Sequence, residues 1–384
     1  MVEYLIATTS DRRHYSLFNA PVNILAERSE YTMSNENSST TSSSQPRGVH
    51  LVGSVPLANA EEVFRTASSI LGDRLRRLPD GETGDQTNWI GWQINFLARN
   101  PNFEVRPPDP EAYAPLPSIK LRSPMSSDDI TFENLGYADA ALASYALFSQ
   151  LKQEGALPAH YRFQVSLPTP LAPVAAFVVS EDQATVEPAY ERAMFAELDK
   201  ITHAIPHDEL AIQWDVAVEF GLWEGSTFTH SSSVKTQIIE KLVRLGNRVP
   251  EDVELGYHLC YGDAGHKHFI EPKDTANLVE VANAISAGLE RQINWIHMPV
   301  PRNRDDDAYF APLRNLHLHP ETELYLGLVH YTDGSEGTQR RIAAAQKVIA
   351  DFGVATECGF GRRPPETIPE LLRIHSEVAV PVSA

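Results

Sequence analysis

From Gly48 onward, short apolar runs alternate with longer stretches in which apolar residues recur every three or four positions. The short runs predict strands at 48–54, 74–80, 161–168, 210–216, 253–260, 293–298, 324–330 and 354–358. The stretches between them predict helices with one apolar face at 59–72, 185–205, 233–249, 274–289 and 337–353.

Eight strands separated by helices favour an α/β fold, a single (β/α)8 TIM barrel over residues 47–384. A doubly wound open sheet is the alternative, but no glycine-rich phosphate loop follows the first strand. The stretch 101–160 is longer than one loop and helix need, and its first half is rich in proline. We therefore predict an insertion at the barrel rim.

The segment 34–46 is polar and of low complexity, which predicts that residues 1–46 are a disordered extension. The chain has 384 residues and a net charge of −19, which argues against nucleic acid or an anionic membrane as partner. Its two cysteines exclude a disulfide scaffold. With neither a signal peptide nor a membrane span in the pattern, we expect a cytoplasmic protein with small-molecule partners.

Candidate metal ligands stand where three of the predicted strands end, which is the active-site end of a barrel. His258 and Cys260 close the fifth strand and, being two residues apart, point to the same face. Cys358 closes the eighth strand. Two thiolates and an imidazole suit Zn²⁺ with a fourth position left for substrate. Alternatively, both cysteines are small buried hydrophobic residues.

Other reactive side chains follow the same rule of position. Asp215 ends the fourth strand, Glu82 follows the second, and His330 closes the seventh. The two carboxylates could bind a substrate ammonium or act as acid or base, and His330 could transfer protons. Each could equally be a hydrogen-bonded loop residue. We interpret His266 and His268, in "GHKHF", as part of a solvated loop rather than a second metal pair.

Taken in chain order, these pieces resemble the catalytic barrel of cobalamin-independent methionine synthase. "HLVGSVP" (50–56) is similar to the opening segment of that family, which holds the amino-acid end of homocysteine. "DGETGD" (80–85) and "QWDVAVE" (213–219) are similar to two further substrate-binding segments. The resemblance implies that Val52, Gly53, Ser54, Glu82 and Asp215 bind substrate.

The metal segments of that family resemble "YHLCYGD" (257–263) and "TECGFGRR" (356–363), which implies that His258, Cys260 and Cys358 are zinc ligands. "LVHYTDGSEG" (328–337) resembles the segment of the proton donor, which implies this role for His330. The family has a glutamate as fourth ligand. Here the corresponding strand carries His297 instead. Either His297 replaces the glutamate as fourth ligand, or this protein has no fourth ligand.

The function implied is zinc-dependent methyl or alkyl transfer to a thiol such as homocysteine. The donor is open between a folate and a corrinoid, because "VSLPTPLAPV" (165–174) replaces the folate segment of the family. Two alternatives remain. One is a zinc-dependent lyase or hydrolase acting on a small carboxylate, and the other is a metal-free barrel that binds a ligand without catalysis.

Overall fold

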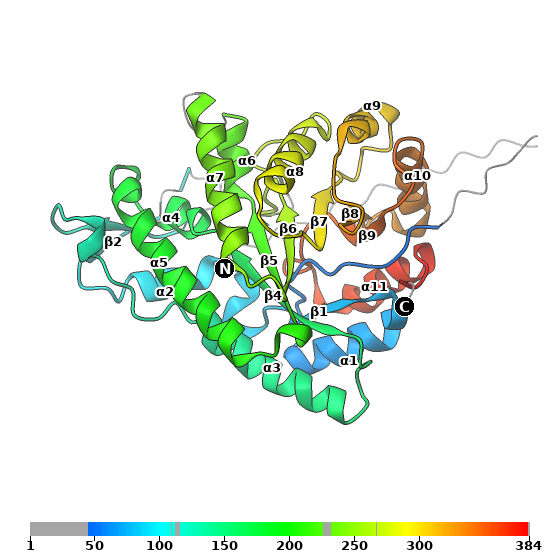
Figure 1. Cartoon of the computed structure of the whole chain (residues 1–384), viewed down its shortest axis with the longest axis horizontal. Helices are drawn as coiled ribbons and strands as arrows, with labels where there is room; N and C mark the ends of the chain where they lie inside the picture. The colour runs from blue at the N-terminus through cyan, green and yellow to red at the C-terminus, as the bar shows by residue number, and fades with distance from the viewer. Residues whose placement is uncertain (1–44, 109, 112–115, 226–231, 266, 383–384) are drawn as a thin grey trace, which may run out of the picture. The chain divides into compact units, whose positions relative to one another are not determined.

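The computed structural model describes residues 45–384 apart from 109, 112–115, 226–231, 266 and 383–384. Within them, seven parallel strands form one sheet in the order β1-β4-β5-β6-β7-β8-β9 (Figure 1). Their bounds are β1 (Arg77–Pro79), β4 (Arg162–Pro168), β5 (Leu210–Val216), β6 (Glu254–Leu259), β7 (Trp295–Pro299), β8 (Glu323–Val329) and β9 (Gly353–Thr356).

Helices follow the strands and surround the sheet (Figure 1). The longer ones are α1 (Ala60–Leu71), α3 (Tyr137–Gln153), α5 (Ser180–Ala204), α7 (Ser232–Arg248), α8 (Ala276–Gly288), α10 (Gly334–Gln346) and α11 (Ile368–Val378). The shorter ones are α2 (Ile94–Leu97), α4 (Leu171–Phe177), α6 (Val218–Trp223) and α9 (Asp307–Phe310). In α1, Asn59 caps the first turn by accepting from the amide of Glu62, and the apolar face of the helix is buried.

The sheet is curled, because charged side chains from strands that are far apart in the strand order contact one another. Arg77 of β1 contacts Glu254 of β6 at 2.5 Å and Glu323 of β8 at 2.8 Å. In a flat sheet, β1 and β8 would be separated by about 24 Å, because neighbouring strands lie roughly 4.8 Å apart. The predicted barrel is therefore confirmed, and the open sheet is excluded.

The predicted first strand forms only in part. Residues 47–52 form a closing segment, and only its first part, 47–50, is bonded to β9 and the residue before it through backbone hydrogen bonds. Val49 makes a parallel bridge to Val354 of β9, and its amide donates to the carbonyl of Arg74 just before β1. The next carbonyls along the segment bind side chains instead of a strand. Gln164 Nε2 donates to the carbonyl of Leu51 at 3.0 Å, and Gln213 Nε2 donates to that of Val52 at 2.6 Å. These amide side chains compete with the ladder and end it.

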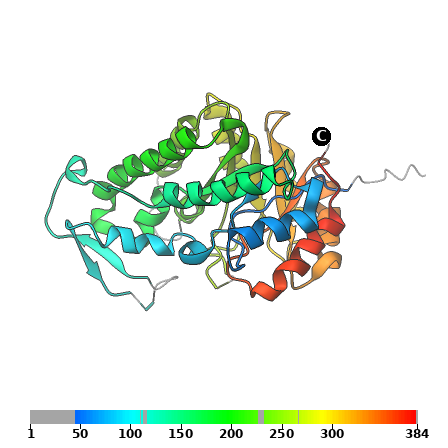
Figure 2. The same cartoon turned by 90° about the horizontal axis from the view of Figure 1, so that it is seen from below.

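The predicted insertion lies in the first half of 101–160, whereas the second half holds α3, which belongs to the barrel and leads into β4. What remains contains an antiparallel hairpin of β2 (Phe103–Arg106) and β3 (Ser118–Leu121). In both views the hairpin lies at the opposite end from α10 and α11 (Figures 1 and 2). The insertion therefore extends the barrel on one side only.

The predicted disordered extension lies outside the described residues, except for its last two. Pro46 is buried, and its carbonyl accepts from the amide of Val380 at 2.9 Å. The ordered barrel thus begins slightly earlier than the predicted boundary. Among the described residues, no helix combines the length and the apolar character needed to cross a membrane.

Candidate metal and substrate site

The predicted functional side chains gather at the carboxyl ends of the strands because parallel strands end on the same side. Asp215 of β5 lies opposite His258 of β6, and His258 lies opposite His297 of β7 in the strand register. Cys260 directly follows β6, and Cys358 lies two residues after β9. One face of the barrel therefore carries both the predicted metal ligands and the predicted carboxylates.

His258, Cys260 and Cys358 form a compact group whose ligand atoms all lie within 4.8 Å of one another. The two sulfur atoms are 3.8 Å apart, and both cysteines are free thiols. Two thiolates bound to one tetrahedral zinc at about 2.3 Å would be separated by roughly 3.8 Å. The spacing of the sulfur atoms therefore fits a shared zinc ion.

The hydrogen bonds of His297 determine which nitrogen of His258 is left as a free acceptor. His297 Nε2 must carry a proton, because it lies 3.0 Å from the carbonyl of Thr356, which can only accept. His297 Nδ1 is then an acceptor for His258 Nδ1, 2.6 Å away. This leaves His258 Nε2 with a lone pair, buried, and without a hydrogen-bond partner among the described residues. An unpartnered buried acceptor of this kind fits a metal ligand.

His297 itself lies outside the compact group. Ligation of a metal by His297 stays a prediction, and it would require His297 Nδ1 to give up its contact with His258. In the arrangement seen here, His297 orients His258, as partners of metal-binding histidines commonly do.

The acid–base state of the group changes if a cation is present. Burial lowers the pKa of His258 well below its usual value, so this imidazole is neutral and has its lone pair available. The hydrogen bond to Cys358, followed by burial, raises the pKa of Cys260 well above that of an ordinary thiol. Without a cation the thiol therefore stays protonated, whereas a bound divalent metal would favour the thiolate.

Two carboxylates, the buried Asp215 and the partly buried Glu82, form the second part of the site. Asp215 accepts from Gln213 Nε2 at 2.9 Å and from Trp89 Nε1 at 3.2 Å, and burial raises its pKa to about 7. The pKa of Glu82 is raised well above its usual range by burial and next by the charge of Asp215. Two neighbouring carboxylates without a cation between them are suited to binding one.

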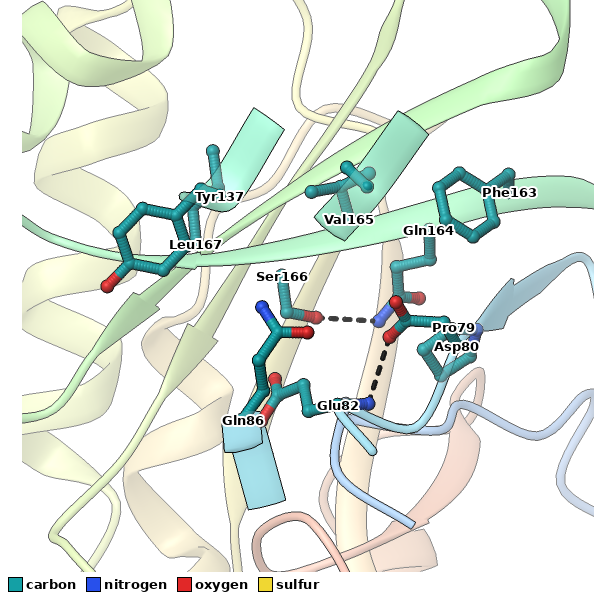
Figure 3. A pocket seen from close by; sticks show the side chains of 11 residues that line it. Pro79, Asp80, Glu82, Gln86, Tyr137, Phe163, Gln164, Val165, Ser166 and Leu167 are labelled. Carbon is teal, nitrogen blue, oxygen red and sulfur yellow. Dashed lines mark hydrogen bonds between the residues drawn. The ribbon is translucent and has the colours of Figure 1, made fainter. Parts of the chain in front are cut away.

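The Glu82 carboxylate lies against Gly53 and Ser54, which directly follow the closing segment. Ser54 Oγ donates to Glu82 Oε2 at 2.8 Å. A Cβ at Gly53 would lie 2.7 Å from Glu82 Oε1, so a side chain there would displace the carboxylate. Glu82 has a positive φ of 49°, and its amide donates to Asp80, which holds this unusual conformation (Figure 3). Figure 3 shows that the side chains of Asp80 and Glu82 line the same pocket as those of Gln164 and Ser166.

His330 lies directly after β8 and is buried. Its Nε2 lies 2.8 Å from the carbonyl of Val300 and must be the protonated nitrogen, which leaves a lone pair on Nδ1. Nδ1 lies 3.9 Å from Glu357 Oε2. Burial lowers the pKa of His330 to about 3, so the imidazole is neutral and, in this environment, a weak base.

The interpretation of His268 as a solvated loop residue is wrong, whereas His266 lies outside the described residues. The His268 side chain is only 7% exposed, and Nε2 lies 2.7 Å from Glu357 Oε1. The pair of carboxylates around it, Glu357 and Glu271, outweighs its burial and raises its pKa to about 9. Sequence reasoning missed the contacts of this residue and of Trp89, because only the folded loops bring them to the site, and it missed Thr356, which contributes through its backbone carbonyl.

Comparison with known structures supports the family at the level of the fold. The chain aligns over 87% of its length, with a TM-score of 0.58 and 13% identity, to a B12-independent methionine synthase from Shewanella sp. W3-18-1 in complex with selenomethionine, covering 96% of that chain. The protein described here therefore has the methionine synthase barrel fold. A protein named as a candidate vitamin-B12-independent methionine synthase from Listeria monocytogenes aligns over 87% of this chain and 97% of its own, with a TM-score of 0.53 and 15% identity.

A methyltransferase from Methanosarcina mazei also has this fold, with a TM-score of 0.50 and 12% identity over 87% of this chain and 94% of its own. No protein-family model matches the sequence, and neither does any curated protein sequence. At these identities, the similarity to the methionine synthase fold concerns the barrel, and the chemistry must be argued from the residues of this chain.

Proposed function

We propose that this protein transfers a methyl or small alkyl group to a thiol such as homocysteine, using a zinc ion held by His258, Cys260 and Cys358. The observation that carries the proposal is the buried, unpartnered Nε2 of His258 in one compact group with two free thiols. The methionine synthase and methyltransferase structures that share the fold add support. The donor would be a methylated folate or a methylated corrinoid.

When bound, Zn²⁺ lowers the pKa of a substrate thiol, so that a thiolate nucleophile exists at neutral pH. The protein's own contribution is a neutral His258, aimed by His297, and two thiols that can lose their protons to a cation. Three protein ligands leave a place for a substrate sulfur atom.

The carboxylate pair would hold the amino group of the substrate. An ammonium beside Glu82 and Asp215 would relieve the repulsion and the burial cost that raise both pKa values. Ser54 already holds Glu82 in place, and Gly53 leaves room for the carboxylate. Anchoring the substrate at its amino end fixes the position of its sulfur, which is how binding energy accelerates a transfer between two reactants.

His330 is the proposed proton carrier. Nδ1 starts without a proton, and the low pKa of His330 means that it would hold the proton released by the substrate thiol only transiently. Glu357 lies 3.9 Å from Nδ1, and its charge would stabilise the imidazolium. His330 could then return the proton to the leaving group of the donor.

The test combines metal content with turnover in three proteins: wild type, Cys358→Ser, and His330→Gln as a variant with all three ligands intact. Mass spectrometry should find one zinc per chain in wild type and His330→Gln, and none in Cys358→Ser. Homocysteine should be methylated by wild type with methyltetrahydrofolate or methylcobalamin, and more slowly by His330→Gln. A zinc-loaded wild type that alkylates no thiol with either donor would reject methyl transfer and favour the lyase or hydrolase. A wild type without zinc would favour the metal-free barrel.

A further inference from the structure

A cleft of about 680 Å³ opens beside the candidate site, at the carboxyl ends of β6 to β9. The loops that follow all four of these strands contribute to its walls. His330 and Glu357 line the cleft. Glu357 directly precedes Cys358 in the chain, so the cleft lies next to the proposed metal group. Its volume lies within the range of small-molecule sites, about 300–1,000 Å³.

The acidic side chains of the cleft already have cationic partners. Glu271 and Glu357 both contact His268, at 3.1 and 2.7 Å. Asp263 pairs with Arg362 at 3.1 Å. The negative charges of the cleft are therefore largely compensated within the protein.

Two guanidinium groups of the cleft, those of Arg302 and Arg363, form no hydrogen bond or ion pair with a carboxylate that the structure describes. The side chain of Arg302 donates to Thr332 Oγ1 at 3.0 Å, which orients it but brings no negative charge. The side chain of Arg363 has neither a hydrogen bond nor an ion pair with any residue that the structure describes. Arg363 is also partly buried, and this burial lowers its pKa, although the nearby charges of Asp263 and Glu357 partly offset the effect. A partly buried cation without a direct partner becomes more stable when an anion binds to it.

We propose that this cleft is an anion-binding site in which Arg302 and Arg363 bind a carboxylate or phosphate group of a small organic ligand. A guanidinium matches both groups with paired N–H donors. The overall charge of −19 disfavours anions over most of the surface, so guanidinium groups that have no directly bound carboxylate are the places where an anion can bind. The proposal does not rest on methyl transfer or on a metal.

The experiment is isothermal titration calorimetry on the full chain at low ionic strength, with inorganic phosphate and succinate as separate probes. The variants are Arg302→Gln, Arg363→Gln and the double variant. Arg65→Gln is the matched control, because Arg65 pairs with Glu61 on α1, outside the cleft lining. Circular dichroism and thermal unfolding confirm that each variant is folded.

Wild type and Arg65→Gln should bind at least one probe, and each cleft variant should weaken binding by about tenfold, since a charged hydrogen bond is lost. Binding of phosphate alone would identify a phosphate ester as the ligand, and binding of succinate alone would identify a carboxylate. Binding of neither probe, or equal binding by the double variant, would overturn the proposal. Cys260→Ser, which alters the metal group alone, should bind like wild type. Loss of binding in that variant would place the anion on a metal and would also overturn it.

Discussion

The two ends of the barrel interior treat buried charge in opposite ways. At the amino ends of the strands, Arg77 is 4% exposed, contacts Glu254 and Glu323, and stacks over Trp295 at 4.2 Å. At the carboxyl ends, His258 Nε2 has no partner among the described residues, and the carboxyl groups of Glu82 and Asp215 both have raised pKa values. At the amino ends the buried charge is paired by other residues of the protein, whereas at the carboxyl ends some buried polar groups have no such partner.

This difference separates stability from function in one barrel. Buried polar groups in folded proteins are nearly always satisfied, so a cluster that is left unsatisfied indicates a bound ligand or a reaction. We therefore expect changes at the amino end to cost mainly stability and changes at the carboxyl end to cost mainly metal binding and activity.

The largest expected effect is that of Cys260→Ser, which removes one thiolate from the compact group. Methyl transfer should fall by about four orders of magnitude or more, or roughly 5 kcal/mol in the activation barrier. In chelator-treated protein, the free energy of unfolding should change by only about 1 kcal/mol, as for an ordinary substitution. Steady-state kinetics and urea unfolding measure the two quantities. A large loss of stability in the metal-free variant would show that Cys260 also contributes to folding, which would contradict the expected division between stability and function.

A smaller effect, on stability alone, is expected for Arg77→Met. It leaves Glu254 and Glu323 without their buried cation, which should lower the free energy of unfolding by about 3 kcal/mol. Arg76→Met is the matched control, because Arg76 pairs with Glu323 from a 42% exposed position and should cost less than about 1 kcal/mol. Urea unfolding measures both. A loss of bound zinc in folded Arg77→Met would show that the two ends are not independent.

His297→Phe separates an orienting role from a ligand role. If His297 orients His258 through the contact between their Nδ1 atoms, zinc affinity should fall by about 10- to 100-fold, as for other partners of metal ligands. If His297 is itself a ligand, zinc should be lost as fully as in Cys260→Ser. Competition with a chromogenic chelator gives the affinity. Unchanged affinity would show that His297 does neither.

The smallest effect concerns pH. Because burial raises the pKa of Asp215 to about 7, its carboxyl group is largely protonated at pH 6 and cannot attract an ammonium. The affinity for an amino acid such as methionine should therefore rise by about tenfold between pH 6 and pH 8, following the ionised fraction. Calorimetry at several pH values measures this. Asp215→Asn should bind more weakly and lose most of the slope, and a wild-type affinity that falls with pH would contradict the role of Asp215.

The barrel was predictable because its strands and helices have distinct apolar periodicities. The exception is informative. The closing segment has the apolar residues of a strand, but Gln164 and Gln213 take its carbonyls, and these side chains come from strands more than 100 residues later. No local pattern encodes such a competition.

The candidate site was predictable where its residues lie on strands or at strand ends. His258 and Cys260 follow from the alternation of a strand, and Cys358 and Asp215 from their positions at the same end. The contact of His297 with Thr356 and that of His268 with Glu357 were not predictable, since strand spacing and loop course decide them. The tautomer of His258 depends on the first of these contacts, so it required the structure.

Zinc X-ray absorption on the purified protein tests the proposed ligand set. We expect two sulfur neighbours at about 2.3 Å and at least one nitrogen neighbour at about 2.0 Å. A second nitrogen that disappears in His297→Phe would make His297 a ligand. A zinc ion with no sulfur neighbours would contradict the assignment of His258, Cys260 and Cys358 as the metal site.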